Sequence, residues 1–175
     1  MKNLMQSIAQ SGVLVPCLAR QNGERYELIS GHRRKAACKA LGISTLPVIV
    51  KDMTREEAII TMVDSNVQRE HILPSEKAMA YKMKLDAIKH QGARTDLGKE
   101  STSTQVAQKL SVEKVGDDDG VSKDTVRRYI RLTNLTPELQ DMVDDKKISF
   151  NPAVELSYLK PEEQDMFLEA METAQ

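Results

Sequence analysis

Tryptophan is absent from this sequence, and the other aromatic residues are few. Aromatic residues make up only 3% of the 175 residues, whereas apolar residues make up 40% and methionine occurs nine times. Aromatic side chains bury the largest areas in most protein cores, so this core must rely on aliphatic side chains and methionine. The composition therefore favours packed helices, in a chain long enough for one large domain or two small ones.

Cysteine and long apolar runs are also scarce. Cys17 and Cys38 lie far apart and have no histidine at metal-ligand spacing, which predicts buried free thiols in a reducing compartment. No apolar run reaches the roughly 18 residues that a membrane-spanning helix needs. The N-terminal stretch MKNLMQSIAQSG is typical of a short amphipathic helix and not of a signal peptide. We therefore expect a cytoplasmic protein that has no membrane partner.

The sequence has no excess of positive charge. Its 25 lysines and arginines nearly balance 26 aspartates and glutamates, and the formal net charge is −1. A large basic surface attracts nucleic acid over its whole extent, and this chain cannot offer one. Any contact with nucleic acid must come from a local basic patch.

The first third of the chain alternates between strand and helix patterns. Apolar spacing and turn residues predict helices at 3–10 and 33–41, and strands at 13–20, 25–30 and 46–52. Pro16 interrupts the first strand, which indicates an edge strand because proline cannot donate to a central ladder. Together these elements predict a small α/β unit.

From Thr54 onward the pattern is helical. Thr54 and Glu57 have the spacing of a capping box before a helix at 55–70, and Pro74 suits the first turn of a helix that Gly92 closes. Residues 92–103 predict a flexible loop. The remaining segments predict short helices with short joints, at 104–110, 112–120, 121–132 and 137–148, and from Pro152 and from Pro161 onward. The fold class is thus α+β, with a mixed domain at 1–73 and an all-α domain at 74–175.

A glycine followed by two arginines opens the helix of the α/β unit. In the stretch SGHRRKAA, Gly31 lets the backbone approach a ligand closely. The helix start attracts anions through its free N–H groups, and the guanidinium groups of Arg33 and Arg34 suit phosphate oxygens. From the residues alone, an anion site and an exposed basic helix face both remain open.

A second polar group lies in the stretch SNVQREHILPSEKA. Asn66, Gln68 and Arg69 stand together at the end of one predicted helix, just before the acidic start of the next. Amides, an arginine and a nearby carboxylate can hold a phosphate–metal cluster. An ordinary helix terminus has the same composition, so this stretch alone does not choose between the two.

The stretch VEKVGDDDGVSKDTVRRYIRL has the spacing of a helix-turn-helix near residues 111–132. Gly116 takes the position where the two helices cross, Gly120 makes the turn and Val121 and Val126 supply buried positions. The second helix would present its polar side chains to the major groove and the phosphates: Ser122, which also caps it, Lys123, Thr125, Arg127, Arg128 and Arg131.

One residue departs from the helix-turn-helix pattern. Asp119 stands where an apolar residue is usual, in an acidic run that would repel DNA if it faced the duplex. This departure predicts a first helix that is short or shifted. A plain helical hairpin with a basic surface is the alternative to a DNA-binding motif.

Taken in order, these motifs resemble the ParB family of chromosome and plasmid partition proteins. SGHRRKAA resembles the family's GERRxxAA box, SNVQREHILPSEKA resembles its ENxQRxxLxPxEEA box, and VLVPCLAR resembles the strand LQPIxVR. SKDTVRRYIRL falls where the family has its recognition helix. The resemblance covers residues 3 to about 160. It implies a ParB/sulfiredoxin-like N-terminal domain that binds CTP, followed by a helix-turn-helix domain that binds a palindromic, centromere-like site on double-stranded DNA.

The resemblance assigns roles to individual residues. Gly31, Arg33 and Arg34 would hold phosphates, Asn66 and Arg69 would complete the phosphate and metal side, and Asn66 is the candidate Mg²⁺ ligand. The remaining residues of the predicted nucleotide site are Pro16, Arg20, His32 and Ser65. His32 and Ser65 replace acidic residues that the family associates with metal binding and hydrolysis. Mg²⁺ prefers hard oxygen ligands, so we expect nucleotide binding with weak CTP hydrolysis at most.

The resemblance also implies partners and leaves alternatives. It implies a homodimer that closes as a CTP-dependent clamp on DNA, a ParA-like ATPase partner, and association with the nucleoid or a plasmid. The family's C-terminal dimerisation domain is not evident, and we expect the chain to be part of a longer one. One alternative is a ParB-like transcriptional regulator without clamp activity, and another is a phosphotransferase on the same fold. Sulfiredoxin chemistry is disfavoured because Gly31 occupies the place of the reactive cysteine.

Overall fold

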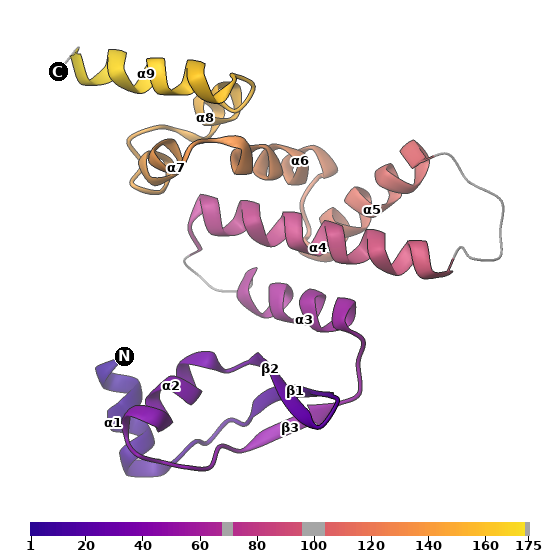
Figure 1. The fold of residues 1–175 in the computed structure, drawn as a ribbon, viewed down its shortest axis with the longest axis vertical. Coiled ribbons are helices and arrows are strands. Elements are labelled where there is room, and N and C mark those ends of the chain that lie inside the picture. Colours follow the sequence, from indigo (N-terminus) through magenta and orange to yellow (C-terminus); the bar gives the residue numbers. More distant parts are fainter. Residues whose placement is uncertain (68–71, 96–103, 174–175) are drawn as a thin grey trace. The chain divides into compact units, whose positions relative to one another are not determined.

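The chain folds into two compact units, Met1–Ser65 and Asn66–Gln175. A computed structural model describes residues 1–67, 72–95 and 104–173 (Figure 1). The α+β prediction is confirmed, because a small sheet occupies the first unit and the second unit is helical. The predicted domain division after residue 73 stays a prediction. Most of the predicted loop at 92–103 lies outside the described residues.

The first unit holds a three-stranded sheet in the order β2-β1-β3. Strands β1 (Cys17–Asn22) and β2 (Arg25–Ser30) pair antiparallel, and β1 pairs in parallel with β3 (Val48–Lys51). β1 is therefore the central strand, and the predicted edge position is wrong. The strand begins directly after Pro16, so the missing N–H of the proline lies outside the ladder.

Three helices accompany the sheet: α1 (Lys2–Ser11), α2 (His32–Ala40) and α3 (Arg55–Val67). Ile8 of α1 and Ala37 and Cys38 of α2 form a small buried cluster between the first two helices. β3 is different, because Val48, Ile49 and Val50 are between 40% and 51% exposed. The core of this unit therefore lies around β1 and α2 rather than along β3.

The predicted capping box at the start of α3 is confirmed. The backbone N–H of Glu57 donates to the Thr54 hydroxyl at 3.2 Å, and the Thr54 N–H donates to the Glu57 carboxylate at 2.8 Å. Each residue satisfies an N–H group that the first turn of a helix leaves without a partner. A short local pattern thus sets the start of α3.

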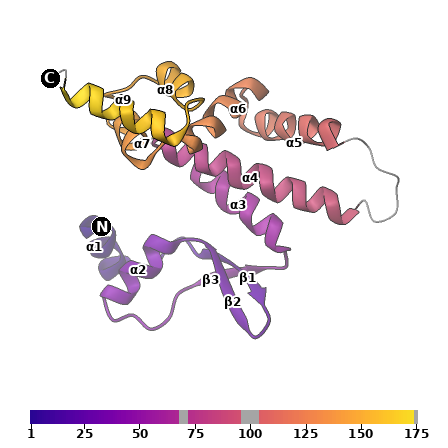
Figure 2. The same ribbon diagram turned by 45° about the horizontal axis from the view of Figure 1, so that its top comes forward.

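The second unit is a bundle of helices (Figures 1 and 2). They are α4 (Pro74–Thr95), α5 (Thr104–Asp119), α6 (Lys123–Arg131), a 3-10 turn (Leu132–Asn134), α7 (Pro137–Asp144), α8 (Phe150–Leu156) and α9 (Pro161–Thr173). Pro74 begins α4 as predicted, but α4 continues past Gly92 to Thr95. The two short helices predicted at 104–110 and 112–120 form the single helix α5, so the first helix of the motif is not short. No helix in the described ranges has the length and apolar character of a membrane span.

The core of the second unit is aliphatic, as the composition predicts. Its buried members come from α4, the 3-10 turn and the residue after it, α7, the joint after α7, and α8: Ala78, Leu132, Leu135, Leu139, Val143, Ile148, Ala153 and Val154. Ser75 at the start of α4 adds a polar link, because its N–H donates to the Asp144 carboxylate at 3.0 Å and its hydroxyl binds the same group. A carboxylate there also complements the partial positive charge of the helix start.

Gln164 of α9 is buried, and its side chain joins α9 to two neighbouring loops. Its carbonyl oxygen accepts from the Thr136 N–H at 2.9 Å, and its amide donates to the carbonyls of Asn134 and Leu159, both at 3.1 Å. The side chain is only 1% exposed. The Thr136 N–H and the carbonyls of Asn134 and Leu159 therefore all form hydrogen bonds with this one side-chain amide.

We predict that Gln164→Leu lowers the free energy of unfolding by about 2–4 kcal/mol. The substitution keeps the volume but leaves buried backbone groups without partners, and each such group costs about 1–3 kcal/mol. Chemical denaturation followed by circular dichroism measures the change. Asp165→Ala, at the exposed neighbouring position, is the control and should shift stability by less than about 0.5 kcal/mol. An equal, small effect of both substitutions would contradict this role of Gln164.

Candidate nucleotide-binding and DNA-binding sites

The start of α2 has the features of an anion site. Gly31 precedes the helix with φ 106° and ψ 19°, in the left-handed region, and no side chain caps the helix. The first turn contains no acidic residue. The free N–H groups and the partial positive charge of a helix start attract anions, and the first turn of α2 itself supplies no carboxylate that would compete for them.

The first residue of β1, Cys17, packs closely against this helix start. A Cβ atom placed on Gly31 would lie 2.2 Å from Cys17 Sγ and 2.8 Å from Cys17 Cβ. The Cys17 thiol, itself fully buried, donates to the Gly31 carbonyl at 3.6 Å. Only glycine fits at position 31, because both the left-handed backbone and the buried thiol exclude a side chain.

The two arginines of the motif have different surroundings. The Arg34 guanidinium donates through Nη1 to the carbonyl of Val15 and, at 2.9 Å, to that of Pro16. Arg34 thus ties the segment before β1 to the start of α2. Arg33 is exposed, and so is His32. The structure therefore brings Pro16, Gly31 and Arg34 together, and leaves His32 and Arg33 open to a ligand.

Arg20 lies on β1, opposite Glu27 of β2. Its guanidinium binds the Glu27 carboxylate through Nη2 at 2.7 Å and Nε at 2.8 Å, and the side chain is only 12% exposed. A phosphate would have to compete with this carboxylate for the guanidinium. Sequence reasoning missed Glu27, although the alternating strand pattern on either side of the turn at Gly23 places the two residues face to face.

The second polar group is described only in part. Ser65 donates its hydroxyl to the Met62 carbonyl at 2.8 Å, and Asn66 is half-buried. Ser65 ends the first unit and Asn66 begins the second, whereas Arg69 lies outside the described residues. The grouping of these three residues with Gly31 stays a prediction.

The donor atoms present do not fit a protein-held Mg²⁺ site. Mg²⁺ is usually bound through one or two carboxylates, but the two boxes carry His32 and Ser65 in the acidic positions. Within the described ranges, no group of three or more histidine, cysteine, aspartate or glutamate side chains is arranged to hold a metal ion. The predicted role of Asn66 as a Mg²⁺ ligand therefore stays a prediction, with no such cluster around it among the described residues.

The helix-turn-helix forms with the geometry that the glycines predict. A Cβ atom on Gly116 would lie 2.6 Å from the Val121 carbonyl oxygen, so α5 and the turn touch through the backbone. The Val121 N–H donates to the Gly116 carbonyl at 2.9 Å, and Gly120 has φ 66°. Ser122 then caps α6 by accepting from the Thr125 N–H at 3.1 Å.

The polar side chains of α6 divide into two groups. Lys123, Arg127 and Arg128 are exposed and have acidic or amide partners. Lys123 Nζ lies 3.6 Å from Glu113 Oε1, and Arg127 Nη1 lies 3.2 Å from Asp124 Oδ1. Arg128 donates through Nη2 to the amide oxygen of Asn151. Arg131 is different. Its Nη2 donates to the Ser157 carbonyl at 2.7 Å and its guanidinium lies 3.8 Å from the Tyr158 ring centroid. These contacts tie α6 to the end of α8.

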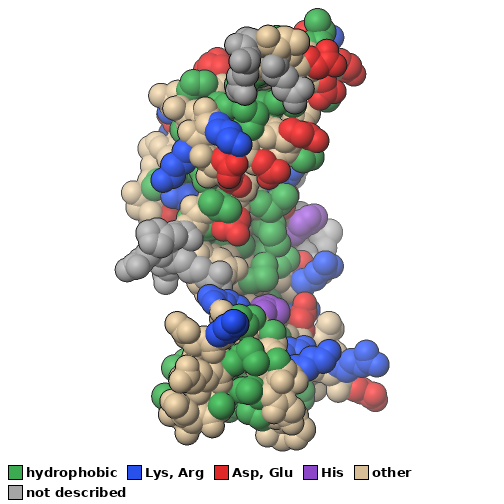
Figure 3. Space-filling view, turned by 90° about the vertical axis from the view of Figure 1, so that its left-hand side faces the viewer, with side chains coloured by type: hydrophobic (Ala, Val, Ile, Leu, Met, Phe, Trp, Pro, Cys, Tyr) green, Lys and Arg blue, Asp and Glu red, His purple; other side chains and the backbone are tan. Residues whose placement is uncertain are grey.

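Sequence reasoning missed the partners of these cations. Asp124 precedes Arg127 by three residues on one helix, a spacing that predicts such a pair. Asn151 and Ser157 lie on or beside α8, and no local signal connects them to α6. Basic side chains on the face in Figure 3 form small separate groups among acidic and apolar ones, as the balanced charge predicts.

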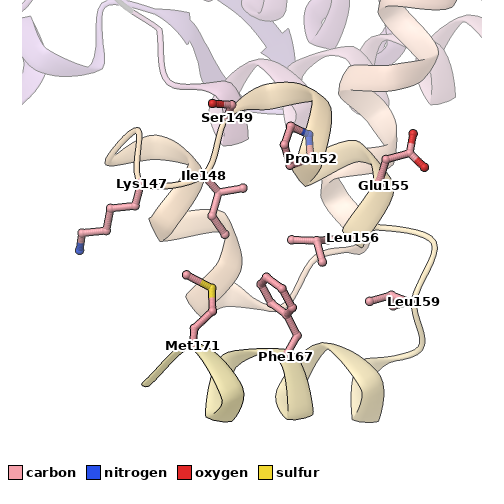
Figure 4. A pocket seen from close by; sticks show the side chains of 9 residues that line it. All are labelled: Lys147, Ile148, Ser149, Pro152, Glu155, Leu156, Leu159, Phe167 and Met171. Atoms are coloured by element: carbon pink, nitrogen blue, oxygen red, sulfur yellow. The ribbon is translucent and has the colours of Figure 1, made fainter. Parts of the chain in front are cut away.

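A pocket of about 590 Å³ lies in the helical unit, lined by residues of α8, α9 and the segment before α8. Ile148, Leu156 and Phe167 point into it, and Lys147 points away (Figure 4). The lining is mainly apolar and contains none of the predicted nucleotide-binding residues. This pocket is therefore not the predicted phosphate site.

We predict that Gly31→Ala destabilises the protein more than Gly42→Ala does. Both glycines have positive φ, which costs a non-glycine residue about 1–2 kcal/mol. A Cβ added at position 42 has no atom within 4 Å, whereas a Cβ added at position 31 clashes with the Cys17 thiol. Such overpacking costs a further amount of about 1–3 kcal/mol. Thermal and urea unfolding measure both variants. Equal losses would show that the contact with Cys17 does not restrict position 31.

Comparison with known proteins identifies both halves of the chain. The ParB N-terminal domain matches residues 1–67, and the ParB HTH domain matches residues 99–175. The chromosome-partitioning protein Spo0J of Thermus thermophilus is 32% identical over 163 residues, which are 93% of this chain and 53% of that protein. A nucleoid occlusion protein of Oceanobacillus iheyensis is 32% identical over 167 residues, 94% of this chain and 51% of that protein. This chain thus spans about half the length of these relatives.

A solved structure has the same fold. The C-terminally truncated ParB of Caulobacter crescentus, complexed to the centromeric parS site, is similar with a TM-score of 0.54 at 21% identity, over 90% of this chain and 74% of that one. With both domains matched in order, and with the glycine–arginine helix start and the helix-turn-helix in place, this chain belongs to the ParB family.

Proposed function

We propose that this chain is the DNA-recognising and nucleotide-binding part of a partition protein. In this proposal α6 enters the major groove of a palindromic, centromere-like site, and the start of α2 binds the triphosphate of CTP. The observation that carries the proposal is the Ser122-capped helix α6, packed across Gly116 and exposing Lys123 and Arg127. The names of relatives, which include chromosome-partitioning proteins, support the same function.

The side chains of α6 suit different roles on DNA. Lys123 and Thr125 lie in the first turn, which approaches base edges in proteins of this class. Among the described residues, Arg127 is paired with Asp124, an exposed partner on the same helix, and such surface pairs are weak. A phosphate or a guanine can therefore replace that carboxylate at little cost. Arg131 contributes by holding α6 against α8, and Arg128 lies 5.2 Å from the Phe150 ring centroid.

For the nucleotide, the residues of the first unit fit a polyphosphate. The N–H groups of the first turn of α2 and the exposed Arg33 would bind phosphate oxygens, and Pro16 and Arg34 would shape the wall beside them. The bound nucleotide would supply negative charge that draws these groups together. The proposal includes neither a Mg²⁺ site nor CTP hydrolysis, because His32 and Ser65 stand in the acidic positions of the motif and no metal-ligand cluster forms among the described residues.

We also propose that two chains pair on the palindrome and close as a clamp that depends on CTP. A ParA-like ATPase would then act on the complex at the nucleoid or on a plasmid. A second candidate is a ParB-like regulator that binds DNA without closing a clamp. Substitution of both motif acids by His32 and Ser65, and the similarity to a nucleoid occlusion protein, favour that candidate.

Arg127→Ala should weaken binding to the preferred duplex by about 1–3 kcal/mol if the side chain reads a base. The duplex is selected by the chain from a random library, and affinity is measured by fluorescence anisotropy over a salt series. Binding should weaken as salt rises, because phosphate contacts release counterions. Arg25→Ala removes the same charge from an exposed position on β2 and serves as the control. No selected sequence, or no effect of Arg127→Ala, would contradict recognition by α6.

Arg33→Ala should abolish binding of the nucleotide that the chain prefers. Calorimetric titrations with CTP, ATP and GTP measure this, and we expect CTP to bind most tightly. Lys39→Ala, which removes an exposed charge from the last turn of the same helix, should leave binding unchanged. If none of the three nucleotides binds the unmodified chain, the nucleotide half of the proposal is wrong and the DNA half stands alone.

A further inference from the structure

Lys84 of α4 is a buried lysine in the helix-turn-helix unit. Its side chain is 0% exposed, and its Nζ lies 3.2 Å from Asp118 Oδ2 and 3.7 Å from Asp119 Oδ1. A buried ammonium group is costly unless carboxylates compensate it. The acidic run at the end of α5 therefore has a partner inside the protein, and its two last members do not serve only as surface charge.

Lys84 also stabilises the end of α5, where three acidic side chains follow one another. Asp117, Asp118 and Asp119 are the last three residues of the helix, where the partial negative charge of the helix end disfavours acidic side chains. The last turn contains no basic residue of its own. A cation from α4 offsets both charges. Asp119, only 12% exposed, takes an inward position where this motif usually has an apolar residue.

The same stretch of α4 also contacts the recognition helix. Tyr81 lies three residues before Lys84, is fully buried, and meets the ring of Tyr129 of α6 edge-on at 5.7 Å between centroids. Burial, together with the nearby Asp119 charge, raises the pKa of Tyr81 to about 12. α4 thus holds the end of α5 through Lys84 and the body of α6 through Tyr81.

The connection between these two contacts is short. Asp119 ends α5, and only Gly120, Val121 and Ser122 precede α6. Gly116 fixes how near the turn comes to α5, but backbone contact at a glycine does not fix how far α5 slides along α4. An ion pair is directional, and buried polar pairs are best known for setting register between helices.

We propose that Lys84, Asp118 and Asp119 are positioning residues that set the register of α5 on α4 and so aim α6 at the DNA. The inference rests on the proposed DNA-binding function. It assigns the acidic run, which departs from the usual motif, a role in sequence discrimination. Replacing the pair by apolar residues would then preserve the fold and impair the choice between duplexes.

The test compares Lys84→Met with the double variant Lys84→Met/Asp119→Leu. The single variant leaves carboxylates without their buried cation, so we expect a lower melting temperature. The double variant should regain that temperature, since apolar replacement of a buried pair is often neutral or stabilising. We expect its affinity for the selected duplex to stay about tenfold below that of the unmodified chain, within the range measured for coupled contacts. Its affinity for a shuffled duplex should not change.

The matched control is Lys82→Met/Asp117→Asn, which removes the same charges at exposed positions of α4 and α5. It should retain discrimination between the two duplexes. If the Lys84→Met/Asp119→Leu variant discriminates as well as the control does, the positioning role is wrong. Asp118→Asn removes only the more exposed of the two carboxylates, which is 45% exposed, and leaves Asp119 beside Lys84, so it should show a smaller loss of the same kind.

Amide hydrogen exchange separates failure of this inference from failure of the proposed function. If the unmodified chain does not distinguish the two duplexes, DNA recognition itself is wrong. Exchange at the Val121 N–H, which donates to the Gly116 carbonyl, and at the Thr125 N–H, which donates to Ser122, then reports how firmly the turn and the start of α6 are held. Faster exchange in the Lys84→Met/Asp119→Leu variant than in the control, at equal melting temperature, supports positioning by Lys84. Equal exchange overturns it.

Discussion

The close approach of α5 to the turn at Gly116 is the constraint on which the helix-turn-helix depends. The Val121 carbonyl takes the space that any side chain at position 116 would need. This contact and the Val121 N–H bond to the Gly116 carbonyl bring the start of α6 against α5. The cap by Ser122, the burial of Val126 and the exposure of Lys123 all follow from that placement.

Many of the charged side chains described in this protein bind nearby groups of the same fold. The net charge is close to zero, and several of the cations described have a partner within the fold. Arg34 holds carbonyl groups, Arg20 holds Glu27, and Arg131 holds Ser157. Basic residues thus fall into those that partners within the fold hold in place and those that are exposed, such as Arg33.

Patterns confined to a few neighbouring residues were predictable from the sequence. The capping box of Thr54 and Glu57, the cap at Ser122, Pro74 at the start of α4 and the glycine at the helix crossing depend on contacts within about five positions. The central place of β1, the buried amide of Gln164 and the contact of Arg131 with Ser157 depend on chain segments that are distant in sequence. No local spacing encodes those pairings, which explains why they emerge only from the structure.

The exposed edge strand β3 affects how readily two molecules of the chain associate in concentrated solution. Its three valine and isoleucine side chains are half-exposed, and its outer backbone groups have no strand beside them in the part of the sheet described here. Such an edge is a template for pairing with a second molecule. Four residues offer few main-chain bonds, the last of the four is Lys51, and Asp52 follows it at once. Brevity and flanking charge therefore act as the safeguard against fibrous self-association, so lengthening this strand with apolar residues would remove it.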